Sequence, residues 1–447
     1  MDRKIFIEKL FARAAEEGMT QCQVSYSSGE SFEVSVLKGE VLSYNVSDVA
    51  NLSFRALVNG RMGSASTQAL DDEAIEMLVA SAKTNAELVD SDDEEFMYDG
   101  TGEYAKVENY VPAIDEVSAA DKIAFAREME EKTLARDSRM DQLEDCAIFS
   151  ESSEYAIVNT LGLNVSCRSN MLAGYVAPVA RDGEKVSSGM KMFVSADGTM
   201  DGSDEAIDEA VKEAVDYLYA DSVPSGEYPA IFRYDAMWTL LSTFAGVFSA
   251  DNAQKGLSRL NGREGDKIAS ECVTIVDDPH MALSASSVPF DGEGVPTRYK
   301  EIIKSGVLET LMHNLKTAHK QGVASTGNAA HGSAGGISFS NLYVAPGEKS
   351  FDDMVSEMGD GLVICSLQGA HAGADAISGD FSLSARGYRV ENGRIADAVK
   401  QITVAGNFYE ILSAITCVGS DLKFGLPGNS RVGSPSVMVK KISVAGK

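Results

Sequence analysis

The stretch DSVPSGEYPAIF, residues 221–232, divides the sequence into two halves of different character. It holds two prolines and a glycine within six residues, and these are the residue types that most often mark loops and boundaries. Helical and strand-like patterns alternate before it, whereas short glycine-rich strands dominate after it. We therefore predict an α+β protein with an N-terminal α+β domain over 1–222 and a β-rich C-terminal domain over 223–447.

The N-terminal half contains the same order of patterns twice: strands, glycine-marked turns, more strands and a helix. The turns LKGE (37–40) and VNGR (58–61) are typical of β-hairpins, because Gly and Asn tolerate positive φ. The two series end in similar helical segments, DDEAIEMLVASA (71–82) and SDEAIDEAVKEA (203–214). This similarity favours an internal duplication, with units of about 1–115 and 116–222, over a chance likeness.

In the C-terminal half we expect helices only near 235–250, 308–320, 350–358 and 407–415. The segment GDFSLSARGYRVENGRIADAVKQITVAG (379–406) alternates apolar and polar residues around an ENGR turn. It predicts a hairpin of two long strands.

Composition narrows the classes of function. The 447-residue chain carries a net charge of -28 and has no cluster of Lys and Arg, which argues against direct nucleic-acid binding. Its six scattered cysteines form no C-x-x-C pair and are expected to be buried free thiols. No apolar run approaches the roughly 20 residues of a membrane span, and the first helix lacks the features of a signal peptide. We therefore expect a cytoplasmic protein without a membrane partner.

The histidines give no metal motif. All five follow residue 279, and no pair has the i, i+4 spacing of a zinc-protease helix. His313 and His319 fall on the expected helix 308–320 and face different directions, so they are interpreted as polar helix surface. The Gly/Ser-rich string 325–341 favours a mobile surface loop over an anion cradle.

The segment QGAHAGADAISGDFSLSARGY (368–388) contains His371, Asp375 and Asp380 together with four glycines. The glycines permit tight turns. Asp380 stands just before a strand, where its default role is to accept hydrogen bonds from N–H groups of the turn. His371 has no partner nearby in the sequence.

Long segments resemble the TldD/PmbA family, metalloprotease-like proteins also called modulators of DNA gyrase. They are EVSVLKGEVLSYNVSDVANLSFRALVNGRMGSAST (33–67), FSNLYVAPGEKSFDDMV (339–355), the run from GAHAGADAISGD to VGSDL (369–422) and GSPSVMVKKISVAG (433–446). The chain is most similar to the PmbA (TldE) branch. The resemblance implies two related α+β units followed by a largely β domain.

In the TldD branch a helix carries H-E-x-x-x-H, and a distant cysteine completes the metal site. Aligned on QKGLSRLNGREGDKI (254–268), these positions hold Leu241, Ser242 and Gly246, none of which binds zinc or accepts a proton from water. The cysteine position falls within 426–437, which has no cysteine. The resemblance thus implies no catalytic or metal residue and no bound cofactor in this chain, with zinc in a TldD-type partner.

The resemblance further implies a subunit that forms a homodimer, or a heterodimer with a TldD-type chain, and helps to shape a groove for unfolded or precursor peptides. His371, Asp375 and Asp380 then become groove-lining or turn residues. Two alternatives stay open. One is an active metallopeptidase with a displaced site built from His280, His331, His371 and acidic groups, and the other is a peptide-binding scaffold without a link to proteolysis.

Overall fold

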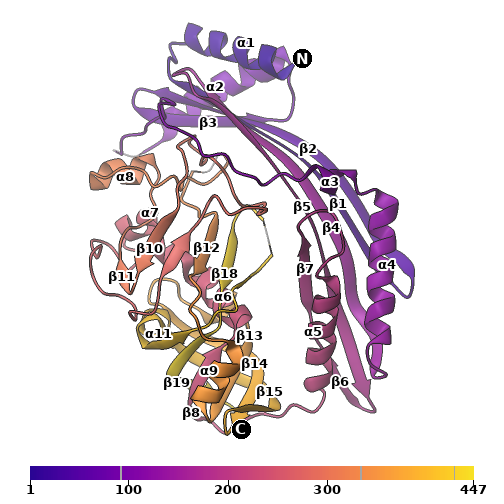
Figure 1. Cartoon of the computed structure of the whole chain (residues 1–447). Coiled ribbons are helices and arrows are strands. Elements are labelled where there is room, and N and C mark those ends of the chain that lie inside the picture. The colour runs from indigo at the N-terminus through magenta and orange to yellow at the C-terminus, as the bar shows by residue number, and fades with distance from the viewer. Residues whose placement is uncertain (91–92, 333–334, 427) are drawn as a thin grey trace.

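The computed structural model describes residues 1–90, 93–332, 335–426 and 428–447. A long curved sheet carries helices on its outer side, and the C-terminal domain lies on its inner side (Figure 1). The predicted α+β class with a β-rich C-terminal region is confirmed. None of the described helices is long and apolar enough to cross a membrane.

The first unit is a helix, a long hairpin with a short third strand, and a second helix. Its elements are α1 (Arg3–Glu16), β1 (Cys22–Leu37), β2 (Glu40–Val58), β3 (Arg61–Thr67) and α2 (Asp72–Leu88). Both predicted hairpin turns are present, with positive φ at Lys38–Gly39 and at Asn59–Gly60. Helix α2 begins after Asp71, whose side chain accepts a hydrogen bond from the Ala74 N–H.

The second unit has a similar order of elements, with one additional short helix at its start and one additional strand. They are α3 (Pro112–Glu116), α4 (Ala119–Ala135), β4 (Met140–Asn159), β5 (Asn164–Asp182), β6 (Lys185–Ser188), β7 (Lys191–Ser195) and α5 (Ser203–Asp216). Strands of both units form one sheet in the order β3-β2-β1-β4-β5-β6, with β7 also paired to β5. The two units meet at the antiparallel β1–β4 pair. Their origin by duplication stays a proposal.

The outer face of this sheet is apolar and covered by helices. One core lies under α1 and α2, and another lies under α4 and α5. In both units a glycine lets the chain approach a helix backbone closely: Gly63 lies in β3, and Gly189 directly follows β6. A Cβ at Gly63 would lie 1.8 Å from the carbonyl oxygen of Ala82 in α2, and a Cβ at Gly189 would lie 2.2 Å from that of Ala210 in α5. Only glycine permits these approaches.

The C-terminal domain consists of two six-stranded sheets in the described part of the chain, β11-β10-β9-β12-β18-β17 and β15-β14-β13-β8-β19-β16. An additional β15–β19 pairing closes five strands of the second sheet into a ring. Its strands are β8 (Gly226–Phe232), β9 (Ile275–Asp277), β10 (Lys300–Lys304), β11 (Val307–Leu308), β12 (Asn341–Val344), β13 (Gly361–Gln368), β14 (Asp380–Glu391), β15 (Arg394–Asn407), β16 (Ile415–Val418), β17 (Lys423–Phe424), β18 (Arg431–Ser434) and β19 (Val437–Ala445). Its helices are α6 (Tyr234–Phe244), the 3-10 helix η1 (Ala245–Phe248), α7 (Ala250–Gln254), α8 (Leu315–Gln321), α9 (Phe351–Met358), α10 (Ala370–Gly373) and α11 (Phe408–Ala414).

The predicted hairpin of this domain is confirmed as β14 and β15, which pair around Asn392 and Gly393, both at positive φ. Helices α6, α9 and α11 fall close to their expected places. Helix α6 contacts β13 of one sheet and β18 of the other, so it lies between them at the centre of the main C-terminal core.

Candidate functional site

A pocket of about 520 Å³ lies between the inner face of the N-terminal sheet and loops of the C-terminal domain. Strands β1, β2, β4 and β5 form its floor, and residues 285–288, 331–332 and 428–429 form its other wall. The floor contains many small polar side chains, among them Ser27, Ser31, Ser47, Asn51, Ser153 and Ser169, together with Glu30, Glu151 and Glu154. Such a surface suits a polar main chain better than an apolar ligand.

Strand pairing explains why these side chains share one face. Ser27 lies opposite Asn51 of β2 and opposite Tyr155 of β4. Cross-strand partners point to the same side of a sheet, and side chains alternate along each strand. Apolar residues such as Val24 and Phe54 therefore face the helices, while the intervening polar residues face the C-terminal domain.

Two aromatic rings, those of Tyr155 and His331, meet in the lining of the pocket. The Tyr155 ring lies 4.4 Å from the His331 ring, edge to face, and stacks 6.0 Å from Phe290. His331 keeps solvent access, yet the surrounding protein disfavours its charged form and lowers its pKa to about 4. The imidazole is therefore neutral at physiological pH. It can orient a polar ligand but does not supply positive charge.

The pocket also contains a cysteine that is not a nucleophile. Burial raises the pKa of the Cys167 thiol to about 12, so its reactive thiolate form is scarce at neutral pH. All six cysteines are free thiols, as expected; four of them are buried, whereas Cys167 is partly exposed and Cys272 is exposed.

The positions aligned with the TldD metal motif lie on and just after α6. Leu241 is fully buried in the core between the two C-terminal sheets, whereas Ser242 and Gly246 are exposed. The three residues offer no imidazole or carboxylate to a metal ion. Within the described ranges, no group of three or more His, Cys, Asp or Glu side chains is placed to hold one. The residues at these three positions do not fit a zinc ion. Position 427, inside the aligned stretch 426–437, lies outside the described residues.

The segment around His371 forms a turn. Its three polar candidates, His371, Asp375 and Asp380, have different surroundings and do not form one site. His371 is exposed on the short helix α10. The Asp375 carboxylate accepts hydrogen bonds from the N–H groups of Ile377 and Ser378, which is the turn role expected of Asp380. Asp380 instead accepts from the side-chain amide of Asn407 at 2.8 Å and thereby joins the two ends of the hairpin. In the described part of the chain, none of the three candidates lines the pocket.

Two predictions about polar residues were wrong. His313 precedes α8 and is 1 % exposed, because the Asn314 side chain accepts from the Thr317 N–H and starts the helix there. Residues 325–329 are buried rather than part of a surface loop. Their polar groups have partners: Asn328 donates to the buried Asp277 carboxylate at 2.8 Å. Residues 333–334 of the predicted loop lie outside the described part.

The structure does not bring together the displaced site considered from sequence. His280 is hydrogen-bonded to Thr297, His331 lies against Tyr155, and His371 is on an exposed helix. His319 lies on α8 and is exposed, as expected.

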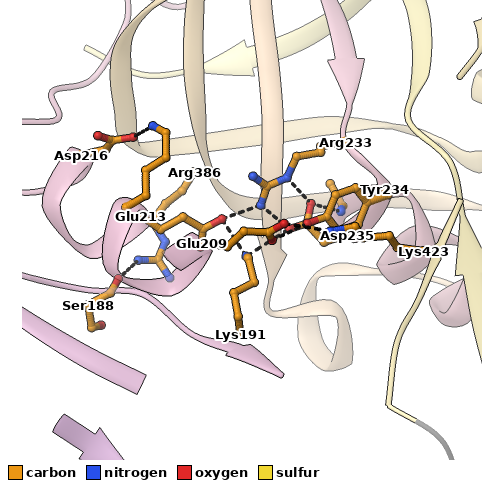
Figure 2. A network of polar contacts seen from close by, with 12 residues as sticks. Ser188, Lys191, Glu209, Glu213, Asp216, Arg233, Tyr234, Asp235, Arg386 and Lys423 are labelled. Carbon is orange, nitrogen blue, oxygen red and sulfur yellow. Dashed lines mark hydrogen bonds and ion pairs between the residues drawn. The ribbon is translucent and has the colours of Figure 1, made fainter. Parts of the chain in front are cut away.

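A half-buried ion network joins α5 and β7 of the second unit to the start of α6 (Figure 2). Arg233 donates to Glu213 at 2.5 Å and also pairs with Asp235. Lys191 donates to Glu213 at 2.7 Å and lies 3.5 Å from Asp235. Side chains in this network are only 12 to 15 % exposed. The network fixes α6, and with it the C-terminal domain, against the N-terminal sheet.

Sequence reasoning missed the pocket itself. The sequence does show the polar face of these strands, as serines and asparagines at alternate positions of β1 and β2. The residues between them are mostly apolar. What the sequence did not show was that both units place this polar face on the same side, toward the C-terminal domain.

Comparisons with known proteins agree with this architecture. Residues 22–86 match domain 1, residues 112–219 the central domain and residues 225–446 the C-terminal domain of the PmbA/TldA metallopeptidases. A Thermotoga maritima structure, named as a candidate modulator of a DNA gyrase, is 35% identical with a TM-score of 0.92 and covers 99% of this chain and 100% of its own.

Two further relatives extend the comparison. The metalloprotease PmbA of Escherichia coli O157:H7 is 28% identical over 432 residues, which is 95% of this chain and 92% of that protein. TldE of Thermococcus kodakarensis has the same fold, with a TM-score of 0.90 at 24% identity over 99% of this chain and 100% of that one. The three domain matches extend over most of the sequence in the order that the fold shows, and the chain therefore belongs to the PmbA/TldD metallopeptidase family.

Proposed function

We propose that this protein is a non-catalytic, PmbA/TldE-like subunit of a TldD/TldE-type metalloprotease acting in the cytoplasm. Its role is to pair with a TldD-type chain, or with a second copy of itself, and to present an extended peptide. The observation that carries the proposal is the combination of a polar pocket on the inner sheet face with motif positions on and just after α6 that hold Leu241, Ser242 and Gly246 in place of zinc ligands. The catalytic zinc then belongs to the partner.

The pocket supports binding of a peptide in an extended conformation. Its floor follows neighbouring strands, so a bound chain can run along the sheet and exchange hydrogen bonds with serine and asparagine side chains. The polar floor contacts main-chain groups that every peptide has, which suits unfolded substrates of varied sequence. The strongly acidic chain and its lack of a basic cluster argue against DNA as the ligand.

Pairing and peptide binding test the proposal together. Light scattering of the purified chain, alone and mixed with the TldD-type protein of the same organism, is expected to show a stable pair in at least one condition. Calorimetric titration with an unfolded peptide is expected to show binding. A chain that remains monomeric in both conditions and binds no peptide contradicts the proposal.

A further inference from the structure

The outer edge of β2 is unpaired over residues 40–51. Within the described part of the chain, β3 pairs with β2 from Leu52 to Val58, and no strand pairs with the earlier residues on that side. The β1–β2 hairpin that carries this edge extends to the margin of the molecule beside α4 (Figure 1). In a strand edge of this kind, every second residue directs its N–H and C=O groups away from the sheet, where another strand can bind them.

Exposed apolar side chains gather along the same edge. Leu42 is 65 % exposed, Val46 is 62 % exposed and Tyr44 is 50 % exposed. Val46 and Tyr44 lie opposite Phe32 and Val34 of β1, which are buried in the core under α4. Cross-strand partners share one face of a sheet, so the apolar surface of this core continues outward to the exposed edge. Contiguous exposed apolar surface is typical of an interaction site.

The stretch EVLSYNVSDVAN (40–51) lacks the residues that usually protect a sheet edge. It contains no lysine and no proline, both of which discourage pairing with another strand. A β-bulge at Leu42 interrupts the β1–β2 register near one end, and the residues from Ser43 onward pair regularly with β1. The regular part of this edge is therefore open to a further strand.

The sequence of the edge is complementary to itself. In an antiparallel pair of two β2 strands centred on Asn45, Ser43 lies opposite Ser47 of the second copy, and Tyr44 lies opposite its Val46. Polar side chains then meet on the inner face of the sheet, and apolar side chains meet on the helix side. None of these residues is charged, so two chains of net charge -28 meet without like charges at the contact.

The length of the edge fits the same register. Strand β2 begins at Glu40, directly after the turn at Lys38 and Gly39. With Asn45 at the centre, this turn of the second copy lies close to Asn51, just before the residues that pair with β3. The second strand therefore fills the unpaired edge and displaces no strand of the first copy. A centre at Ser47 would instead place the second strand where β3 lies.

We propose that the unpaired edge of β2 binds the same edge of a second copy of this chain, so that the two N-terminal sheets become continuous. The contact uses one surface on both copies, so it closes with two chains. The inference rests on the proposed function and deepens it by naming the partner and the surface. Because Ser47 lines the pocket, Ser43 of the second copy extends the polar floor beyond the edge of the first sheet.

Sedimentation equilibrium of the full-length chain tests this contact. The wild type is expected to have the mass of two chains. Two double variants place like charges opposite each other: one combines Tyr44→Lys with Val46→Lys, and the other combines Tyr44→Glu with Val46→Glu. Each is expected to raise the dissociation constant of the dimer at least about tenfold. An equimolar mixture of the two is expected to restore the pair, because each lysine then faces a glutamate.

The matched control changes an exposed valine elsewhere in the same sheet. Val186 lies on β6, and Val186→Lys is expected to keep the mass of two chains. Double variants that remain dimeric overturn the β2 contact. A mixture that stays monomeric also overturns it, because the loss in each variant would then come from the fold rather than from facing charges.

The wild-type result separates this inference from the function beneath it. A chain that is monomeric alone at every concentration measured, yet pairs with the TldD-type protein of the same organism, overturns pairing with a second copy and leaves the proposed subunit role intact. A chain that pairs with neither overturns both.

Discussion

The Arg233 guanidinium of the C-terminal domain donates a hydrogen bond of 2.5 Å to the Glu213 carboxylate of α5. Glu213 also accepts from Lys191, so a single acidic side chain holds two cations in a site that is about 15 % exposed or less. We predict that Glu213→Ala lowers the free energy of unfolding by about 3–5 kcal/mol, because it leaves buried positive charge with only Asp235 as partner. Urea denaturation measures this change.

The control for this variant is an exposed pair. Lys441 and Glu227 lie 2.9 Å apart, with side chains more than half exposed. Lys441→Ala is expected to change the free energy of unfolding by less than about 1 kcal/mol, since exposed ion pairs contribute little. Equal effects of the two variants would contradict the role given to the Figure 2 network.

Close packing of strand and helix backbones predicts a second effect. A methyl group at Gly63 would overlap the carbonyl oxygen of Ala82, so α2 must move away from the sheet. We expect Gly63→Ala to destabilise the protein by about 1–3 kcal/mol through overpacking, and Gly189→Ala to act in the same way. Gly29→Ala is the control, because its nearest neighbour would be 3.7 Å away. A thermal melt of Gly63→Ala that coincides with that of Gly29→Ala would refute the prediction.

The carboxyl groups of Asp291 and Glu293 in the C-terminal domain predict that the stability of the protein depends on pH. Burial raises the pKa of Glu293 from 4.5 to about 7 and that of Asp291 from 3.8 to about 6. The folded state therefore holds these protons more tightly than the unfolded state. Their contribution is fully present below about pH 4 and is lost as pH rises toward 7.

Glu293→Gln isolates this contribution. The stability of the wild type relative to Glu293→Gln is expected to fall by about 1–3 kcal/mol between pH 4.5 and pH 7.5, at up to about 1.4 kcal/mol per pH unit. Denaturation at several pH values measures the difference. If the stability difference between the wild type and Glu293→Gln stays constant, or grows with pH, the pKa of the Glu293 carboxyl is not raised in the folded state.

Filling the pocket predicts loss of peptide binding. Ser153 lies on the floor and exchanges a 3.0 Å hydrogen bond with Ser169 across the strands. Ser153→Trp is expected to weaken binding of an unfolded peptide at least tenfold, because the indole occupies the groove. Glu73→Trp, on the exposed face of α2, serves as the control for a surface tryptophan. Unchanged affinity in Ser153→Trp would place the peptide elsewhere.

Local signals in the sequence predicted much of this fold. The ENGR turn and the alternation on both sides of it predicted the β14–β15 hairpin, and the helical segment DDEAIEMLVASA (71–82) predicted α2. The residues that carry these signals act within a few positions of one another, so no knowledge of distant contacts is needed.

The site could not be derived in this way, because it depends on pairing between distant segments. Ser27 meets Asn51 across one hairpin, but Tyr155 joins the same face only through the β1–β4 pairing of the two units, and His331 comes from the other domain. The buried position of His313 likewise depends on where Asn314 starts α8. The family resemblance supplied the expected peptide groove, and the strand register shows which residues form the pocket.

Peptide cleavage with zinc analysis tests the central claim most directly. The purified chain, the TldD-type protein of the same organism and their equimolar mixture are each incubated with an unfolded peptide, and zinc is measured in each sample. The account predicts no cleavage and no stoichiometric zinc in the lone chain, with cleavage that depends on the partner. Stoichiometric zinc together with cleavage by the lone chain would contradict it.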